Sequence, residues 1–252
     1  MPNATLRRAP AFLASVTNTQ EAYTAFAAGA DVIDCKDPTT GALGRLDLEE
    51  ISSIAKAVSA LAPVSATIGD SFEGVDHRVR AAQEVAATGV AIVKCGFDGA
   101  PGDIVAAEAL ANAQLGEAKL FAVLMADRVS DFSLVPHLAR LGFIGVMLDT
   151  AGKAQGALPQ IMGEDRICAF LSIARSYGLA AGLAGSLRLS DIIPLSELGP
   201  DILGFRGALC EGGRTGAVDE ARVAAVRCEI DRVAGRSREK SVAGSDARAD
   251  SQ

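Results

Sequence analysis

The chain has 252 residues, of which 49% are hydrophobic, and this length and composition suit a compact α/β protein with a sizeable core. Its formal net charge of -7 and its pI of about 4.9 argue against a general surface for nucleic acid or for an anionic membrane. The absence of Trp also argues against a base-stacking surface, so an anionic ligand must meet a local cluster of cations and amides.

Short apolar runs alternate with helical segments along nearly the whole chain. The predicted strands are 12–16, 31–36, 64–68, 90–95, 119–124, 144–148, 179–184 and 201–205. Helices are predicted at 18–29, 46–61, within 73–88, at 103–115, 132–141 and 165–177, from Ser190, and at 217–233. Single glycines repeatedly separate helix from strand. Eight such units predict a single (β/α)8 TIM barrel, with a doubly wound open sheet as the alternative.

The two ends of the chain differ in composition from its middle. We expect an N-terminal extension at 1–11, the barrel at 12–234 and a disordered polar tail at 235–252, because the tail has no aromatic residue and a single Val. No apolar run is long enough for a signal peptide or a membrane span, so a cytoplasmic protein without a membrane partner is expected. The five cysteines form no C-x-x-C pair, which predicts neither a zinc site nor a disulfide framework.

Charged residues gather where the predicted strands end. They are Asp34 and Lys36, Asp70, Lys94, Asp127, and Asp149 with Lys153. In a barrel all strand carboxyl ends meet at one mouth, so these side chains are expected to lie together. A lysine near other cations and away from water loses proton affinity, and its neutral amine can form a Schiff base while carboxylates move protons. The alternative is a ring of ion pairs at the barrel rim.

The segments after the last two strands have a different character. Gly185 and Ser186 follow one strand, and Arg206 and Gly207 follow the next. Barrel enzymes often hold a phosphate between these two loops, where backbone amides and a helix N-terminus attract the anion. Arg206 is predicted to add charge and paired hydrogen bonds, or else to form a salt bridge at the rim. The stretch 212–216 is interpreted as a flexible loop and not as a nucleotide motif.

Several of these stretches, in their order, resemble one known family. They are 29–38 with 41–44, 65–70, 93–94, 147–151, 184–186 and 206–208, and together they resemble the (5-formylfuran-3-yl)methyl phosphate synthase family over roughly residues 12–230. The resemblance implies condensation of two glyceraldehyde 3-phosphates into a furan aldehyde phosphate, without a cofactor, on the route to methanofuran or a related C1 carrier. Such an enzyme is a carbon–oxygen lyase acting on phosphates.

The same resemblance implies roles for individual residues. Lys36 is similar to the Schiff-base lysine of the family and Lys94 to its second catalytic lysine, while Asp34, Asp149 and Lys153 are similar to its supporting acid, base and binding residues. Cys35 and Asp37 depart from the motif, where an aliphatic residue and Asn are more usual. Cys35 is expected to point away from the mouth, whereas Asp37 can alter the charge near Lys36.

A triose phosphate is therefore the expected small-molecule partner, and a homo-oligomer is expected. The residues alone leave open which lysine forms the imine. They also leave two alternatives: another Schiff-base barrel of the class I aldolase type, and a non-catalytic barrel that binds a phosphometabolite. Strand-end acids beside amines favour catalysis, because a pure binding site does not need them.

Overall fold

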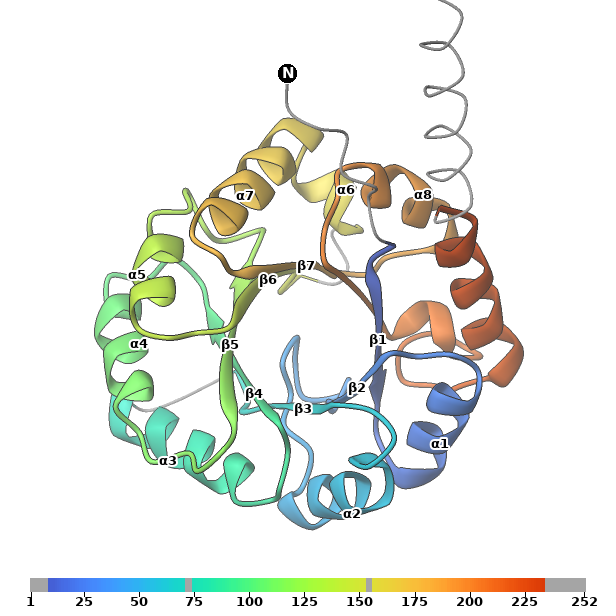
Figure 1. Ribbon diagram of the computed structural model, residues 1–252, viewed down its shortest axis with the longest axis horizontal. Coiled ribbons are helices and arrows are strands. Elements are labelled where there is room, and N and C mark those ends of the chain that lie inside the picture. The colour runs from blue at the N-terminus through green and yellow to red at the C-terminus, as the bar shows by residue number, and fades with distance from the viewer. Residues whose placement is uncertain (1–8, 71–73, 153–155, 234–252) are drawn as a thin grey trace, which may run out of the picture.

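The structure, a computed structural model, describes residues 9–70, 74–152 and 156–233. Its strands are parallel and form one closed barrel in chain order, in which β1 pairs with both β2 and β8. Figure 1 shows the helices arranged as a ring around this barrel. The predicted (β/α)8 barrel is confirmed, and the open sheet is not formed.

The strands and helices alternate as the sequence predicts. The strands are β1 (Ala11–Val16), β2 (Val32–Cys35), β3 (Val64–Thr67), β4 (Ile92–Phe97), β5 (Lys119–Met125), β6 (Gly145–Asp149), β7 (Ala180–Leu183) and β8 (Ile202–Phe205). The helices are α1 (Thr19–Ala27), α2 (Leu48–Val58), α3 (Val75–Ala86), α4 (Asp103–Ala111), α5 (Leu134–Arg140), α6 (Leu158–Ile161), α7 (Glu164–Ser176) and α8 (Leu189–Glu197). A 3-10 turn, η2 (Gly207–Leu209), follows β8, and residues 220–233 are helical. None of the described helices is long and apolar enough to cross a membrane.

The structure differs from the predicted elements at a few boundaries. β4 continues to Phe97, two residues beyond the predicted end at 95, because Gly96 and Phe97 still pair with β5. The short helix α6 and the turn η2 were not predicted, since neither is long enough to show a helical period. The predicted tail at 235–252 lies outside the described residues.

Alternating side chains along the strands divide the apolar interior into two clusters. The larger cluster lies between the sheet and the helices, and it contains both Cys35 and Cys95. The smaller cluster fills the barrel itself and includes Phe121, Val123 and Met147. Cys35 therefore faces the helices and not the barrel interior, as expected.

The loop between β2 and α2 folds inward over the barrel. Figure 1 shows this blue loop reaching into the ring of strands. Leu43, at the loop's inner end, is 1% exposed and belongs to the inner cluster. Its backbone N–H donates to both carboxylate oxygens of Asp70 at 2.9 Å, and the Asp37 N–H donates to the carbonyl of Gly44 at 2.8 Å. The loop therefore covers the β3–β4 side of the mouth and leaves the side near β1, β7 and β8 open.

Candidate active site

A cavity of about 550 Å³ opens at the carboxyl ends of the strands. Its wall combines residues from the barrel interior with the loops after β7 and β8. Eight predicted site residues line it: Asp34, Lys36, Lys94, Asp149, Gly185, Ser186, Arg206 and Gly207. The fold thus brings together residues as far apart in sequence as Asp34 and Gly207, because they all lie at the same ends of parallel strands.

The deepest charged groups of the cavity are Lys94 and Asp34. The Lys94 Nζ lies 3.1 Å from Asp34 Oδ2, and the two residues are 3% and 0% exposed. Asp34 also accepts hydrogen bonds from Ser15 Oγ at 3.1 Å and from Ser65 Oγ at 2.6 Å. The pairing register sets these contacts, because Ser15 and Ser65 are the residues opposite Asp34 on the two neighbouring strands. The carboxylate is therefore held by three donors in one orientation.

Lys36 and Asp149 form a second pair closer to the opening. The Lys36 Nζ lies 2.9 Å from Asp149 Oδ2, and the side chains are 10% and 5% exposed. The other carboxylate oxygen of Asp149 accepts the backbone N–H of Thr150 at 2.7 Å. Each lysine thus has its own carboxylate beside it, and each carboxylate can take a proton from the neighbouring amine.

The loop after β7 has a tightly constrained backbone. Gly185 has a φ of +102°, and a methyl group on it would lie 2.8 Å from the Thr150 side chain. Ser186, the next residue, has a φ of +52°, the left-handed region that non-glycine residues seldom adopt. α8 begins at Leu189, soon after this turn. Such strain gathers at ligand sites, and residues 185–190, which include this turn and the start of α8, all line the cavity.

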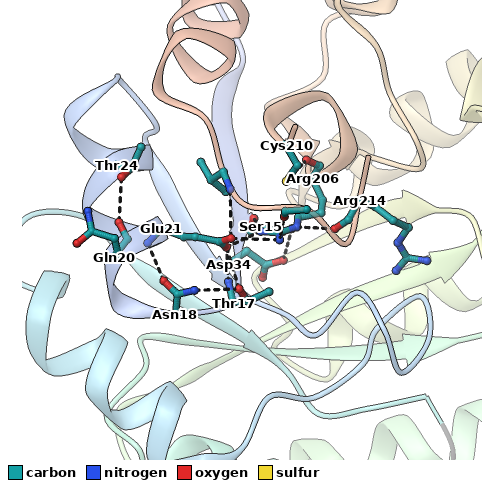
Figure 2. Close-up of polar contacts among 12 residues, drawn as sticks. Ser15, Thr17, Asn18, Gln20, Glu21, Thr24, Asp34, Arg206, Cys210 and Arg214 are labelled. Carbon is teal, nitrogen blue, oxygen red and sulfur yellow. Dashed lines mark hydrogen bonds and ion pairs between the residues drawn. The ribbon is translucent and has the colours of Figure 1, made fainter. Parts of the chain in front are cut away.

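Arg206 lies at the cavity wall, but its guanidinium is engaged by the protein. Figure 2 shows it against Glu21 and the backbone of the 214–216 segment. The Nη1 atom lies 2.6 Å from Glu21 Oε2 in an ion pair whose side chains are 10% and 8% exposed. Burial would raise the pKa of Glu21, but the hydrogen bond and charge of Arg206, with hydrogen bonds from Thr17, hold that pKa below its ordinary value. The Glu21 carboxylate is therefore charged and paired with Arg206.

Three further arginines line the cavity: Arg188, Arg214 and Arg222. Arg214 is half-buried, whereas Arg188 and Arg222 are exposed. The Arg214 Nη2 donates to the carbonyl of Gly41 at 2.8 Å, and this hydrogen bond joins the segment after β8 to the loop after β2. Sequence reasoning missed Arg214 because it follows two glycines in a stretch without a strand or helix pattern.

Asp70, Asp127 and Lys153 are not among the residues that line this cavity. Asp70 holds the loop after β2 and borders a separate hollow of about 220 Å³. Asp127 accepts the backbone N–H groups of Ala151 and Gly152, each at 2.8 Å. Slight burial would raise the pKa of Asp127, but these two amides outweigh it and lower that pKa. Lys153 lies outside the described residues.

Asp37, the other departure from the family motif, accepts hydrogen bonds from residues of its own turn. Its carboxylate accepts hydrogen bonds from the Thr39 N–H and hydroxyl at 2.8 and 2.6 Å, and from the Thr40 hydroxyl at 3.0 Å. The partial burial of Asp37 opposes ionisation, yet these bonds and the charge of Arg214 lower its pKa. Asp37 therefore stabilises the loop that covers the mouth.

Two contacts of Asp34 were also missed from the sequence. Ser15 and Ser65 are hydroxyl residues inside otherwise apolar strands, and both are buried. A buried polar side chain needs a partner, so each serine was a signal that a polar group lies on the same face of a neighbouring strand. The signal does not identify the partner, which depends on the strand register.

A closed parallel barrel with a charged cavity at its carboxyl ends is the architecture of the (β/α)8-barrel enzymes. Phosphoribosyl anthranilate isomerase from Thermus thermophilus has this fold, with a TM-score of 0.63 and 15% identity over 88% of this chain and 99% of that one. 3-Keto-L-gulonate-6-phosphate decarboxylase from Vibrio cholerae has it too, with a TM-score of 0.62 and 15% identity over 90% and 99%. At these identities the likeness concerns the fold alone.

The sequence comparison identifies the family within this class. Residues 12–227 match the profile of the family described as 4-HFC-P synthase. The (5-formylfuran-3-yl)methyl phosphate synthase of Methanocaldococcus jannaschii is 35% identical over 224 residues, which cover 84% of this chain and 95% of that protein. A Methylorubrum extorquens protein provisionally given the same name is 43% identical over 217 residues, or 85% and 89% of the two chains. The chain belongs to the 4-HFC-P synthase family, and the resemblance found in the sequence is confirmed.

Proposed function

We propose that this enzyme condenses two molecules of glyceraldehyde 3-phosphate into (5-formylfuran-3-yl)methyl phosphate, in the biosynthesis of a methanofuran-type cofactor. The reaction balances with the release of one phosphate and two waters. The observation that carries the proposal is the pair of buried lysine–aspartate contacts in a cavity bordered by the Gly185 and Gly207 loops. The names of the relatives support the product, and the resemblance implies the substrate.

In this proposal Lys36 forms the Schiff base. Its side chain is 10% exposed against 4% for Lys94, so its amine meets the contents of the cavity more readily. Asp149, 2.9 Å away, takes the proton that the ammonium must lose before nitrogen attacks the aldehyde. The attack forms a C–N bond, and loss of the aldehyde oxygen as water gives the imine. The imine then acidifies the adjacent carbon, and this favours enolisation and elimination of one phosphate.

Lys94 and Asp34 then act in proton transfer. Asp34 is completely buried and held by Ser15 and Ser65, so its orientation is fixed before substrate binds. A fixed acid–base pair moves protons without the cost of reorganising water. The carbon–carbon bond between the two trioses, ring closure and dehydration each need such transfers.

The remaining predicted residues act in binding. The phosphate retained in the product lies against the loops that contain Gly185, Ser186, Arg206 and Gly207. Lys153 contributes to binding, as the resemblance implies, while Asp70 and Asp127 act through the loops that their carboxylates hold. Holding two trioses in one cavity supplies a large part of the rate, because orientation converts a bimolecular step into an internal one.

The test uses the purified full chain with glyceraldehyde 3-phosphate. Phosphate release and near-ultraviolet absorbance of a conjugated furan aldehyde are followed, and borohydride reduction traps the imine for mass spectrometry. Lys36→Ala should abolish both furan and trapped adduct, and Lys94→Ala should abolish furan. Lys119→Ala is the matched control, because Lys119 is exposed at the start of β5, at the opposite end of the barrel.

Each outcome distinguishes the alternatives. Furan formation with the adduct on Lys36 supports the proposal. Aldol cleavage or exchange without furan would identify an aldolase of the Schiff-base type. Binding without any turnover by the folded protein would identify a non-catalytic barrel and refute the synthase.

A further inference from the structure

We propose that Arg214 is the side chain that binds the substrate phosphate, and that Arg206 with Glu21 is a positioning pair that holds the segment carrying Arg214. This inference rests on the proposed function, because it refines the phosphate site of the same cavity. It changes the role expected for Arg206 from ligand to support.

Arg206 has no hydrogen-bond donor left for a ligand. A guanidinium has five N–H groups, and the structure gives each of them an acceptor. Nε donates to the Arg214 carbonyl at 2.9 Å. Nη1 donates to the Ser15 carbonyl at 3.1 Å and to Glu21 at 2.6 Å, and Nη2 donates to Glu21 at 3.3 Å and to the Gly216 carbonyl at 2.8 Å. A phosphate could bind Arg206 only by displacing one of these acceptors.

The same acceptors fix the segment 210–218. Arg206 holds two of its carbonyls, and Glu21 Oε1 accepts the Val218 N–H at 3.2 Å. Cys210 pairs with Val218 in an antiparallel bridge, and the Glu211 N–H donates to the Ala217 carbonyl at 3.2 Å. The segment is folded tightly, since a methyl group on Gly216 would lie 1.7 Å from the Glu211 carbonyl oxygen. The predicted flexible loop is therefore a braced turn.

This turn presents Arg214 to the cavity. Its backbone carbonyl accepts from Arg206 while its side chain extends the other way, as Figure 2 shows. A methyl group on Gly207 would lie 3.7 Å from the Arg214 Cβ, so Arg214 stands directly beside the loop whose amides are expected to meet the phosphate.

Arg214 also keeps most of its hydrogen-bonding capacity. Among the described residues its guanidinium makes one hydrogen bond, from Nη2 to the Gly41 carbonyl, and four of its five N–H groups have no such acceptor. The charge of Asp37 also attracts Arg214, but the Asp37 oxygens accept from Thr39 and Thr40. Arg214 thus offers a half-buried guanidinium that is held by one hydrogen bond and keeps free donors, which can bind phosphate through paired hydrogen bonds.

The two other arginines of the cavity lack this support. Arg188 and Arg222 are exposed, and within the described residues their guanidinium groups make no hydrogen bond, so each must lose rotamer freedom to bind. They add charge at the entrance, whereas Arg214 is already oriented.

The first experiment measures binding of inorganic phosphate to the full chain by titration calorimetry. Arg214→Ala should bind phosphate on the order of 10- to 100-fold more weakly, the range for loss of hydrogen bonds to a charged group. Arg214→Lys should recover part of the loss. The matched control is Arg175→Ala, because Arg175 is exposed and also donates one Nη2 hydrogen bond to a carbonyl, that of Gly199, away from the cavity. Unchanged affinity in Arg214→Ala, or no saturable binding by the wild-type chain, would overturn the proposal.

The second experiment tests the positioning role with a double-mutant cycle. Arg206→Lys keeps the charge but offers three donors to five acceptors, so it should weaken phosphate binding by loosening the turn. If Arg206 acts only through Arg214, adding Arg206→Lys to Arg214→Ala should weaken binding no further. If the fold-changes in phosphate affinity of the two substitutions multiply in the double variant, Arg206 binds phosphate directly and the positioning role is refuted. Thermal unfolding of each variant confirms that it is folded.

Furan formation, measured in parallel, separates this inference from the proposed function. Phosphate binding that depends on Arg214 in a chain that makes no furan would retain the inference and refute the synthase. Furan formation with unchanged KM in Arg214→Ala would retain the synthase and refute the inference. A raised KM with a smaller change in kcat supports both.

Discussion

Asp34→Asn tests whether the deepest lysine of the cavity depends on its carboxylate. The substitution keeps the size of the side chain and one of the two oxygens that accept from Ser15 and Ser65, but it leaves the Lys94 ammonium, 3% exposed, without a counter-charge. Removing one partner of a buried ion pair costs about 3–5 kcal/mol. In a protein of this length each kcal/mol lowers the Tm by about 2–4 °C, so a decrease of roughly 6–20 °C is expected.

The assay is thermal and urea unfolding of the purified variant at neutral pH. Asp98→Asn is the matched control, because Asp98 pairs with Arg128 at 3.3 Å and both side chains are about half exposed, at 44% and 56%. Exposed pairs contribute about 0–1 kcal/mol, so the control should unfold within a few degrees of the wild type. The two substitutions remove the same charge and differ in burial.

A double variant separates the charge from the hydrogen bonds. Asp34→Asn combined with Lys94→Met removes both charges, and it should recover much of the lost stability because an apolar side chain of similar length has no desolvation penalty. If Asp34→Asn unfolds no earlier than Asp98→Asn, the buried pair contributes no more to stability than an exposed pair does, and the reasoning is refuted. If the double variant stays as unstable as the single one, the loss comes from the serine hydrogen bonds instead.

Three further predictions concern stability and reactivity. Glu21→Gln should be most destabilising at neutral pH. Because Arg206 lowers the pKa of Glu21, the stabilisation that the charged carboxylate gives the wild type is complete above the ordinary pKa of 4.5 and is lost as the pH falls below it. Urea unfolding of both proteins from pH 7 to pH 3 measures this difference. Gly185→Ala should lower the unfolding free energy by about 1–3 kcal/mol and more than Gly178→Ala, since both glycines have positive φ but only the methyl at 185 meets another side chain. An aromatic disulfide reagent should modify the two exposed thiols of the native chain and all five after unfolding, because burial protects the others and raises the pKa of Cys95 to about 12.

The sequence predicts the barrel well because each βα unit carries its own local signals. Apolar runs with terminal glycines define the strands and helices without knowledge of the tertiary structure. Closure then follows from the number of units, and closure brings Asp34, Lys94 and Asp149 to one mouth. For a residue inside a strand, its position along that strand is therefore enough to predict that its side chain faces the mouth.

Residues in the loops could not be sorted in this way. Asp70 and Asp127 follow predicted strands just as Asp149 follows the predicted strand 144–148, yet their carboxylates accept hydrogen bonds from backbone amides of neighbouring loops. Whether a strand-end acid faces the cavity or holds a loop depends on where the next loop folds. The loop after β2 enters the barrel because Leu43 completes the inner apolar cluster, a long-range packing effect with no local pattern.

The arginines of the last two loops show the same limit most clearly. Arg206 was the better candidate from sequence, because it directly follows a strand and precedes a glycine. Its role depends on Glu21, 185 positions away in the chain, which meets it only because β1 and β8 are neighbours in the closed barrel. Once the Glu21 carboxylate and three backbone carbonyls have taken the donors of Arg206, the guanidinium best able to bind a phosphate is that of Arg214, most of whose donors are still free. Barrel closure therefore both assembles the cavity and decides which of its cations remain available to a substrate.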